Sequence, residues 1–219
     1  MTVIRYWTVR PVPGRFDNAI GLLREVAKID ERHGASQTRL SRGIVAGSNS
    51  DTLVFSCEFT DFAAFGAFTD SFMADAEYDA YQARLRAADA PFALLSSALA
   101  TEVTLDRANP QPRRGTVIDA YTFRALSGRL PEAVTLARNA FDLFDRLGAT
   151  RCRLFQEGTG GELAGTHVSI TEFDTVASWG QARDAFLADQ AARVVMDTAS
   201  GVESPIQAIS HSVYTEVSL

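Results

Sequence analysis

The sequence has few cysteines, few histidines and no long apolar runs. Its two cysteines, Cys57 and Cys152, show no CxxC spacing, so we expect two buried, unreactive thiols rather than a disulfide framework or a zinc site. No stretch approaches the roughly 18 uninterrupted apolar residues of a membrane helix. The first ten residues lack the charged and apolar regions of a secretion signal. The sequence therefore predicts a cytoplasmic protein with no structural metal and no membrane partner.

Charge and missing motifs exclude further classes. The formal net charge is −6 and the basic residues are scattered, which argues against a nucleic-acid partner. There is no GxGxxG after a strand, no GxxxxGK[ST], no GxSxG and no HExxH. The glycine-rich run GTGGELAG, residues 158–165, lies between two expected strands and predicts a turn rather than a phosphate loop. Nucleotide-dependent, nucleophile-elbow and zinc-protease mechanisms thus lack their required residues.

What the sequence does contain is a repeat. ERHGASQTRL, residues 31–40, nearly recurs as DRLGATRCRL, residues 145–154. A shift of 114 residues aligns residues 1–105 with 115–219 without a gap, and about 30 pairs are identical. The intervening DRANPQPRR, residues 106–114, holds two prolines and suits an exposed connector. We predict two tandem repeats joined by this linker.

Each copy has the pattern strand, helix, strand, strand, helix, strand. Gly34 and Gly148 stand where a left-handed residue ends the first helix, and His33 is expected to complement the dipole of that helix. The expected elements are strand Val3–Val9, helices Asn18–Arg32 and Glu132–Arg146, strands Gln37–Val45 and Thr52–Phe59, a second helix from about Asp61 or Thr175, and a last strand after Pro91 or Pro205. This βαββαβ order is the ferredoxin-like pattern of a four-stranded antiparallel sheet with helices on one face. Two copies can cover each other's bare sheet faces.

This arrangement, together with EFTDFAAFGAFTDSFMADAEYDAY from Glu58 to Tyr81, resembles the dimeric α+β barrel superfamily. That superfamily includes antibiotic-biosynthesis-type monooxygenases, the NIPSNAP group and stress-responsive barrel proteins. The resemblance implies an α+β fold in which two ferredoxin-like repeats of one chain pack sheet to sheet as an intramolecular barrel, a pseudo-dimer. It also implies a cleft between helix and sheet for a small apolar or aromatic ligand. The oligomeric state beyond the pseudo-dimer, a homodimer of pseudo-dimers included, stays open.

Residues that both copies keep are interpreted as structural. If the hairpin turn lies between Gly47 and Ser50, Arg39 faces Glu58, and Arg153 faces Glu172 in the second copy. Such a cross-strand ion pair contributes roughly 0.2 to 1 kcal/mol. Glu102 and Glu216, at the end of the last strand, receive the same structural interpretation.

Residues that differ between the copies are candidates for a site. Arg5 corresponds to Asp119, Trp7 to Tyr121, Leu53 to His167 and Ser97 to His211. Asp119 and Tyr121 share one strand face, and the strand order implied by the resemblance places His211 near Asp119. This favours His211 as general base, Asp119 as the group that orients it and Tyr121 as donor to an oxyanion. The alternatives are a hydrogen-bonded core histidine at position 211 and an exposed strand-start residue at His167.

Aromatic residues supply the other candidate contacts. Phe62, Phe65, Phe68 and Phe72 recur at helical spacing. This stripe either packs on the sheet or lines an apolar pocket, and periodicity does not separate the two. Phe68, Phe72, Trp7, Arg5 and His167 are therefore the candidate ligand contacts.

The leading hypothesis is a cofactor-independent enzyme acting on a small aromatic or polyketide-like molecule by oxygenation or by proton transfer and cyclisation. The alternatives are a non-catalytic small-molecule-binding or stress-responsive barrel protein, and a duplication with a filled core. In relatives a helical histidine supports monooxygenase or haem chemistry, but the matching positions hold Ala67 and Phe68, and Gln181 and Ala182. We therefore expect no haem and no other cofactor.

Overall fold

A computed structural model describes residues 1–47, 50–107, 113–159 and 161–219 and shows a mixed α+β fold. The chain divides into two compact units. The first comprises Met1–Thr101, Gly158–Glu162 and Glu216–Leu219, and the second comprises Glu102–Glu157 and Leu163–Thr215. The repeat boundaries inferred from sequence, 1–105 and 115–219, remain a prediction.

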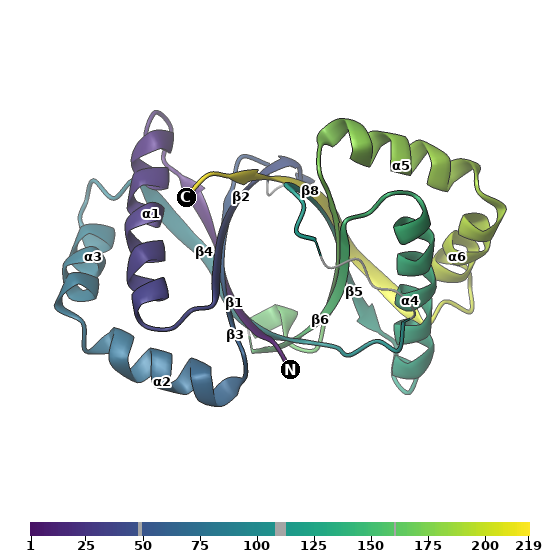
Figure 1. Cartoon of the computed structure of the whole chain (residues 1–219), viewed down its shortest axis with the longest axis horizontal. Coiled ribbons are helices and arrows are strands. Elements are labelled where there is room, and N and C mark those ends of the chain that lie inside the picture. Colours follow the sequence, from purple (N-terminus) through teal and green to yellow (C-terminus); the bar gives the residue numbers. More distant parts are fainter. Residues whose placement is uncertain (48–49, 108–112, 160) are drawn as a thin grey trace. The chain divides into compact units, whose positions relative to one another are not determined.

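The first unit carries three helices on one face of four antiparallel strands (Figure 1). Its elements are β1 (Val3–Pro11), α1 (Phe16–Arg32), β2 (Gln37–Val45), β3 (Leu53–Phe59), α2 (Phe62–Met73), α3 (Ala76–Arg86) and β4 (Phe92–Glu102). The strand order is β4–β1–β3–β2. The last strand therefore lies beside the first, as the ferredoxin-like pattern requires.

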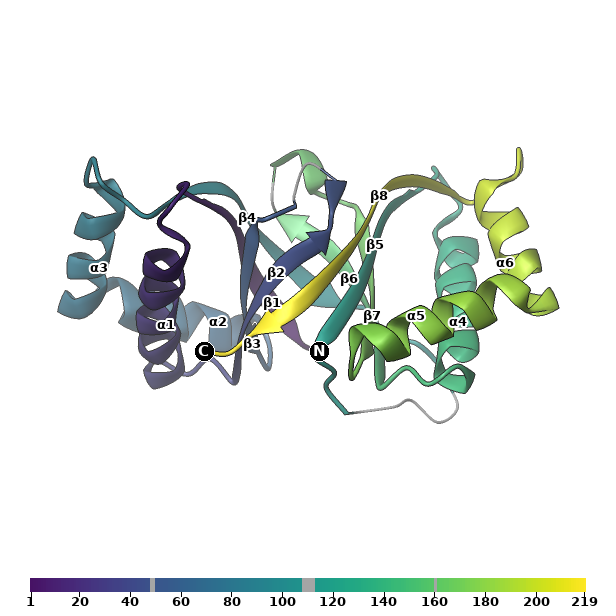
Figure 2. The same cartoon turned by 90° about the horizontal axis from the view of Figure 1, so that it is seen from above.

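The second unit has the same order of helices and strands. Its elements are β5 (Val117–Ala125), α4 (Leu130–Arg146), β6 (Arg151–Thr159), a short 3₁₀ turn η2 (Gly161–Leu163), β7 (His167–Phe173), α5 (Val176–Ala188), α6 (Gln190–Ser200) and β8 (Ile206–Val217). Its strands run β8–β5–β7–β6, all antiparallel. Figure 2 shows α4, α5 and α6 gathered on one face of these strands. The helix-facing side of the sheet is the side on which the candidate site lies.

The predicted helix ends are confirmed. Gly34 and Gly148 follow the caps of α1 and α4 with φ of +106° and +93°, a region that glycine enters without steric cost. The second helices begin at the predicted caps, because the side chain of Asp61 accepts from the N–H of Ala64 and that of Thr175 from the N–H of Ser178.

The prediction of one continuous second helix is wrong in both copies. The chain breaks into α2 and α3 at Asp75 and into α5 and α6 at Asp189. Each aspartate accepts hydrogen bonds from the two backbone N–H groups that open the next helix. A carboxylate that satisfies these otherwise unpaired donors lets a new helix start with a change of direction.

The predicted hairpin register is also wrong, by two residues along the partner strand. Glu58 faces Gln37 and Arg39 faces Ser56, while Glu172 faces Arg151 in the second unit. The side chains keep the predicted face but are displaced along the strands. Arg39 instead pairs with Glu216 at 3.6 Å, and Arg153 holds Glu102 through two hydrogen bonds of 2.8 and 2.9 Å.

Of the aromatic stripe, Phe68 and Phe72 of α2 pack into the core of the first unit, whereas Phe62 is 50% exposed. Phe68 and Phe72 are 1% and 2% exposed and stack at 4.8 Å between ring centroids. Cys57 and Cys152 are free and buried, as predicted, and burial raises the pKa of the Cys57 thiol to about 12.

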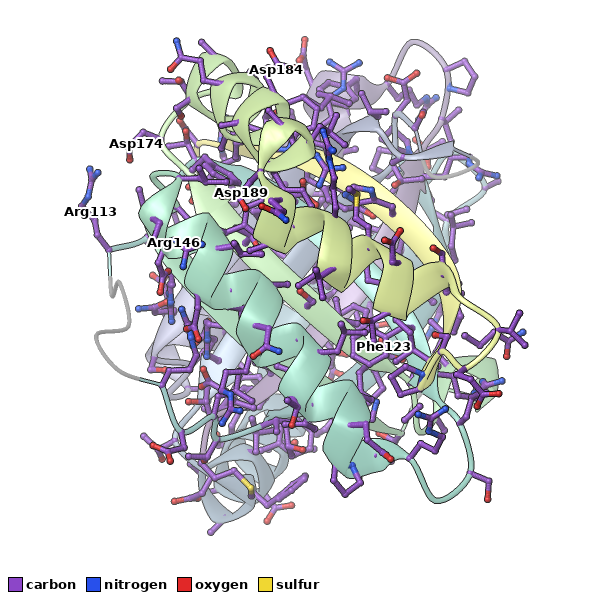
Figure 3. All side chains as sticks on the ribbon, turned by 90° about the vertical axis from the view of Figure 1, so that its right-hand side faces the viewer. Arg113, Phe123, Arg146, Asp174, Asp184 and Asp189 are labelled. Atoms are coloured by element: carbon purple, nitrogen blue, oxygen red, sulfur yellow. The ribbon has the colours of Figure 1, made fainter. Side chains whose placement is uncertain are left out.

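The connector is only partly within the described residues, because 108–112 lie outside them. Asp106 and Arg113 are exposed, as predicted, but Arg107 is not. The Arg107 side chain is 3% exposed and forms ion pairs with Asp142 and Asp145 of α4. At its other end Arg113 pairs with Asp174 at 2.6 Å (Figure 3). In the described part of the chain no helix has the length and apolar character needed to span a bilayer.

Candidate active site in the second unit

The site begins with the alternation of β5. Val117 and Phe123 belong to the core beneath the helices of the second unit, so Asp119 and Tyr121, which share their side of the strand, also face the helix layer. Asp119 is only 6% exposed. A carboxylate in such a place requires hydrogen-bond donors.

Two side chains supply these donors. Nε2 of His211 on β8 lies 2.5 Å from Oδ1 of Asp119, and Nε1 of Trp179 on α5 donates to Oδ2 at 2.7 Å. The strands explain the first contact, because His211 faces Tyr121 across the β5–β8 pair and reaches Asp119 diagonally. The indole fixes the carboxylate from the helix side. The predicted proximity of Asp119 and His211 is therefore confirmed; their catalytic role remains a prediction.

The hydrogen bond to Asp119 selects one tautomer of the His211 imidazole. An ionised carboxylate can only accept, so Nε2 carries the proton and Nδ1 of the neutral ring presents its lone pair. No described residue hydrogen-bonds to Nδ1, and the His211 side chain is 38% exposed. An oriented, partly exposed imidazole with one nitrogen free of such a bond is suited to general-base chemistry.

Tyr121 lies beside this imidazole. Its ring is edge-on to His211 at 5.8 Å between centroids. Burial raises the pKa of the Tyr121 phenol, so the hydroxyl stays protonated at neutral pH and can donate a hydrogen bond.

His167 is the first residue of β7, but it is not exposed, which was one alternative for this residue. It is 2% exposed, and its ring stacks on Phe123 at 5.4 Å with 12° between the planes. Burial lowers the pKa of this imidazole, which favours its neutral form. Its Nδ1 is buried and has no hydrogen-bond partner among the described residues.

Together these rings form what we call the aromatic row: His211, Tyr121, Phe123 and His167. Tyr121 and Phe123 are 6.1 Å apart, so each ring is next to the following one. Phe123 lies behind the helix layer, between α4 and α6 (Figure 3). The row thus runs beneath the helices from a partly exposed imidazole to a buried one.

The remaining candidates, Arg5, Trp7, Phe68 and Phe72, lie together in the first unit. Nη2 of Arg5 is 2.6 Å from Oδ2 of Asp30, whose side chain is fully buried. The guanidinium also lies over the rings of Trp7 and Phe68 at 4.5 and 4.8 Å. Burial raises the pKa of the Asp30 carboxyl and the Arg5 charge opposes that rise. These contacts are all internal to the first unit. Of the two alternatives for the aromatic stripe, Phe68 and Phe72 therefore follow the one in which the side chains pack on the sheet.

Sequence reasoning missed Trp179. Its counterpart in the first copy is Phe65, so the copies differ at this position as they do at Asp119 and His211. Comparing them along the helices as well as the strands would have revealed an indole N–H with no equivalent in the first copy.

A groove of about 390 Å³ lies between α4 and α6, with Leu136, Asn139, Val194 and Thr198 among its walls. Neither Asp119 nor His211 lines it. The charged residues that line the groove include Arg129 and Glu132, whose side chains lie 3.7 Å apart, so the groove and the Asp119–His211 pair are separate features.

No family model matches the sequence, and no curated protein matches it. Solved structures do match over nearly the whole chain. A provisionally assigned monooxygenase from Fusobacterium nucleatum has a TM-score of 0.60 at 10% identity, covering 99% of this chain and 93% of its own. An anthrone oxidase-like protein has a TM-score of 0.60 at 15% identity, with 99% and 91% covered.

A third match is chlorite dismutase from Candidatus Nitrospira defluvii, with a TM-score of 0.56 at 9% identity and coverage of 99% and 91%. At these identities the likeness concerns the fold alone. It supports an α+β fold of the kind that monooxygenase-like proteins have.

Proposed function

We propose that the second unit is the active site of a cofactor-independent enzyme that removes a proton from a small aromatic or polyketide-like molecule. The observation that carries the proposal is the Asp119–His211 pair, in which a buried carboxylate holds one nitrogen of a partly exposed imidazole and the other nitrogen has no hydrogen-bond partner among the described residues. A binding protein has no need to orient an imidazole in this way.

His211 Nδ1 takes a proton from an acidic C–H or O–H of the substrate. Asp119 stabilises the imidazolium that forms, and Trp179 keeps the carboxylate in place. The electrons left on the substrate form an enolate or phenolate, whose oxygen accepts a hydrogen bond from Tyr121. This anion is either reprotonated elsewhere or oxidised by dissolved O₂, and the names of the monooxygenase and anthrone oxidase-like neighbours favour oxidation.

The aromatic row gives the substrate its place in this proposal. A planar molecule would lie against the ring of Tyr121, beside the base at His211.

His33 has both ring nitrogens in hydrogen bonds and His167 is buried against Phe123, so neither offers an open nitrogen to a haem iron. In the proposed mechanism Nδ1 of His211 is the base, and no cofactor takes part.

We further propose that the two copies arose by duplication and pack sheet to sheet as the pseudo-dimer that the resemblance implies. The gapless repeat supports this, as does a structural likeness that covers both copies of this chain. A carrier site built on Phe68 and Phe72 is disfavoured, because both side chains are buried in the core of the first unit.

The test uses anthrone, a small aromatic molecule with an acidic methylene. In air the enzyme should convert it to anthraquinone and water, with O₂ as oxidant, and absorbance follows the product. His211→Ser, which introduces the residue of the first copy, should lower turnover at least about a hundredfold. Gln181→Ala, exposed on α5, is the control and should keep full turnover. Equal turnover in His211→Ser and the parent would remove His211 from the mechanism.

A further inference from the structure

A second constellation of reactive side chains lies in the first unit, on different elements. His33 follows α1, Ser71 lies on α2 and Asp75 stands at the break between α2 and α3. Nδ1 of His33 is 2.9 Å from Oγ of Ser71, and Nε2 is 2.6 Å from Oδ2 of Asp75. Ser71 is exposed. A hydroxyl, an imidazole and a carboxylate are thus connected in that order within hydrogen-bonding distance.

The donors and acceptors assign the protons. Oδ1 of Asp75 accepts the N–H groups of Glu77 and Tyr78, and Arg32 donates to Oδ2 at 2.6 Å. Hydrogen bonds from His33 and Arg32 hold the pKa of Asp75 well below its usual range, so it is ionised at neutral pH. Because Asp75 can then only accept, Nε2 of His33 donates to it and Nδ1 of the neutral ring is an acceptor.

The Ser71 hydroxyl therefore has two acceptors for its one proton. Nδ1 of His33 lies at 2.9 Å, and the carbonyl oxygen of Phe68, one turn earlier in α2, lies at 3.1 Å. When the proton is directed to Nδ1, the arrangement is that of an activated nucleophile with its base and the group that orients the base.

The second copy shows that helix capping does not require this arrangement. Asp189 caps α6 as Asp75 caps α3, but the positions equivalent to His33 and Ser71 hold Leu147 and Ala185. The aspartate is thus explained by its role as a cap, whereas the histidine and serine are additions of the first copy.

We propose that Ser71 is a nucleophilic serine, activated by His33 with Asp75 as its positioning residue, and that it reacts with small activated acyl and phosphonyl esters. Ser71 Oγ bonds to the carbonyl carbon or phosphorus, and the bond to the phenolate or fluoride leaving group breaks. The serine proton passes to His33 Nδ1 and then to the leaving group or solvent. No change of oxidation state is involved. The exposed position of Ser71 favours small, unhindered esters.

The experiment incubates the full-length protein with an alkyl fluorophosphonate and follows the adduct by intact mass and peptide mapping. We expect one phosphonyl group per chain, on Ser71, and none in Ser71→Ala. His33→Gln should slow labelling at least about a hundredfold. An initial burst of one equivalent of p-nitrophenolate from p-nitrophenyl acetate should accompany the same reaction.

Asp75→Asn keeps a capping side chain but removes the charge, and it should slow labelling while the protein stays folded by circular dichroism. Asp189→Asn is the matched control at the equivalent cap and should label at the parental rate. Absence of labelling in the parent protein, labelling at another residue, or an unchanged rate in folded His33→Gln would each overturn the proposal.

Discussion

At the scale of single residues, the second unit places a carboxylate under a helix layer and satisfies it with an indole and an imidazole. Asp119 has a side chain only 7% exposed, so each lost donor leaves a buried charge less well compensated. The two donors also have different consequences. His211 carries the proposed chemistry, whereas Trp179 acts on it only through Asp119.

Trp179→Phe tests this arrangement, because phenylalanine is the residue at the equivalent position of the first copy. The ring remains but the N–H donor to Asp119 is lost. We expect the free energy of unfolding to fall by about 1–3 kcal/mol, measured by urea denaturation. A double-mutant cycle with Asp119→Ala should show coupling of at least about 1 kcal/mol, and strictly additive effects would contradict a stabilising hydrogen bond.

At the scale of helices and strands, the glycines differ in how much space a side chain would find at their positions. A Cβ at Gly115 would collide with the backbone of Phe173, whereas a Cβ at Gly66 in α2 or Gly180 in α5 would meet nothing within 4 Å. The backbone N–H of Gly115 also donates to Glu172 at 2.9 Å, which holds the start of the second copy against β7.

We therefore expect Gly115→Ala to lower the thermal midpoint, because either the backbone or β7 must shift. Gly66→Ala and Gly180→Ala should instead stabilise the protein by about 0.5–1 kcal/mol each, since alanine is the better helix former. Differential scanning calorimetry of the three variants measures the thermal midpoint and the unfolding enthalpy from which these changes in stability follow. Stabilisation by Gly115→Ala would show that the close approach does not exist in solution.

Elements were predictable from sequence where local chemistry decides them. Gly34 and Gly148 predict helix ends because few other residues tolerate their positive φ angles. Asp61 and Thr175 predict helix starts because their side chains can accept from backbone N–H groups of the first turn. The break at Asp75 was missed because an aspartate within an otherwise helical run caps a new helix only where the chain changes direction. The register of Arg39 was missed because residues 46–51 offer several turn positions with equal local preference.

The same contrast holds for the candidate site. Asp119, Tyr121 and His211 follow from strand alternation, strand order and the differences between the copies. Trp179 lies 60 residues from Asp119 on a helix, and which helical side chain reaches which strand depends on packing rather than on any local signal. The burial of His167 against Phe123 depends on tertiary packing in the same way.

At the scale of the whole molecule, the compact units do not coincide with the copies of the repeat. Glu216, from the second copy, belongs to the first unit and pairs with Arg39 there at 3.6 Å. Glu102, from the first copy, belongs to the second unit and holds Arg153 through two hydrogen bonds. Each unit is thus completed by a glutamate at the end of the other copy's last strand.

The two ion pairs should differ in strength, because Arg153 donates to both carboxylate oxygens of Glu102 at 2.8 and 2.9 Å with a side chain just 7% exposed, whereas Arg39 and Glu216 are 3.6 Å apart. Glu102→Gln should cost about 1–3 kcal/mol, since it weakens two charge-assisted hydrogen bonds to a buried guanidinium. Glu216→Gln should cost less than about 1 kcal/mol, because that contact is longer and Glu216 is partly exposed. Native-state hydrogen exchange should show faster exchange in β6 for Glu102→Gln and in β2 for Glu216→Gln. Equal costs, or faster exchange confined to the copy that carries the substituted residue, would mean that the units follow the repeat boundaries after all.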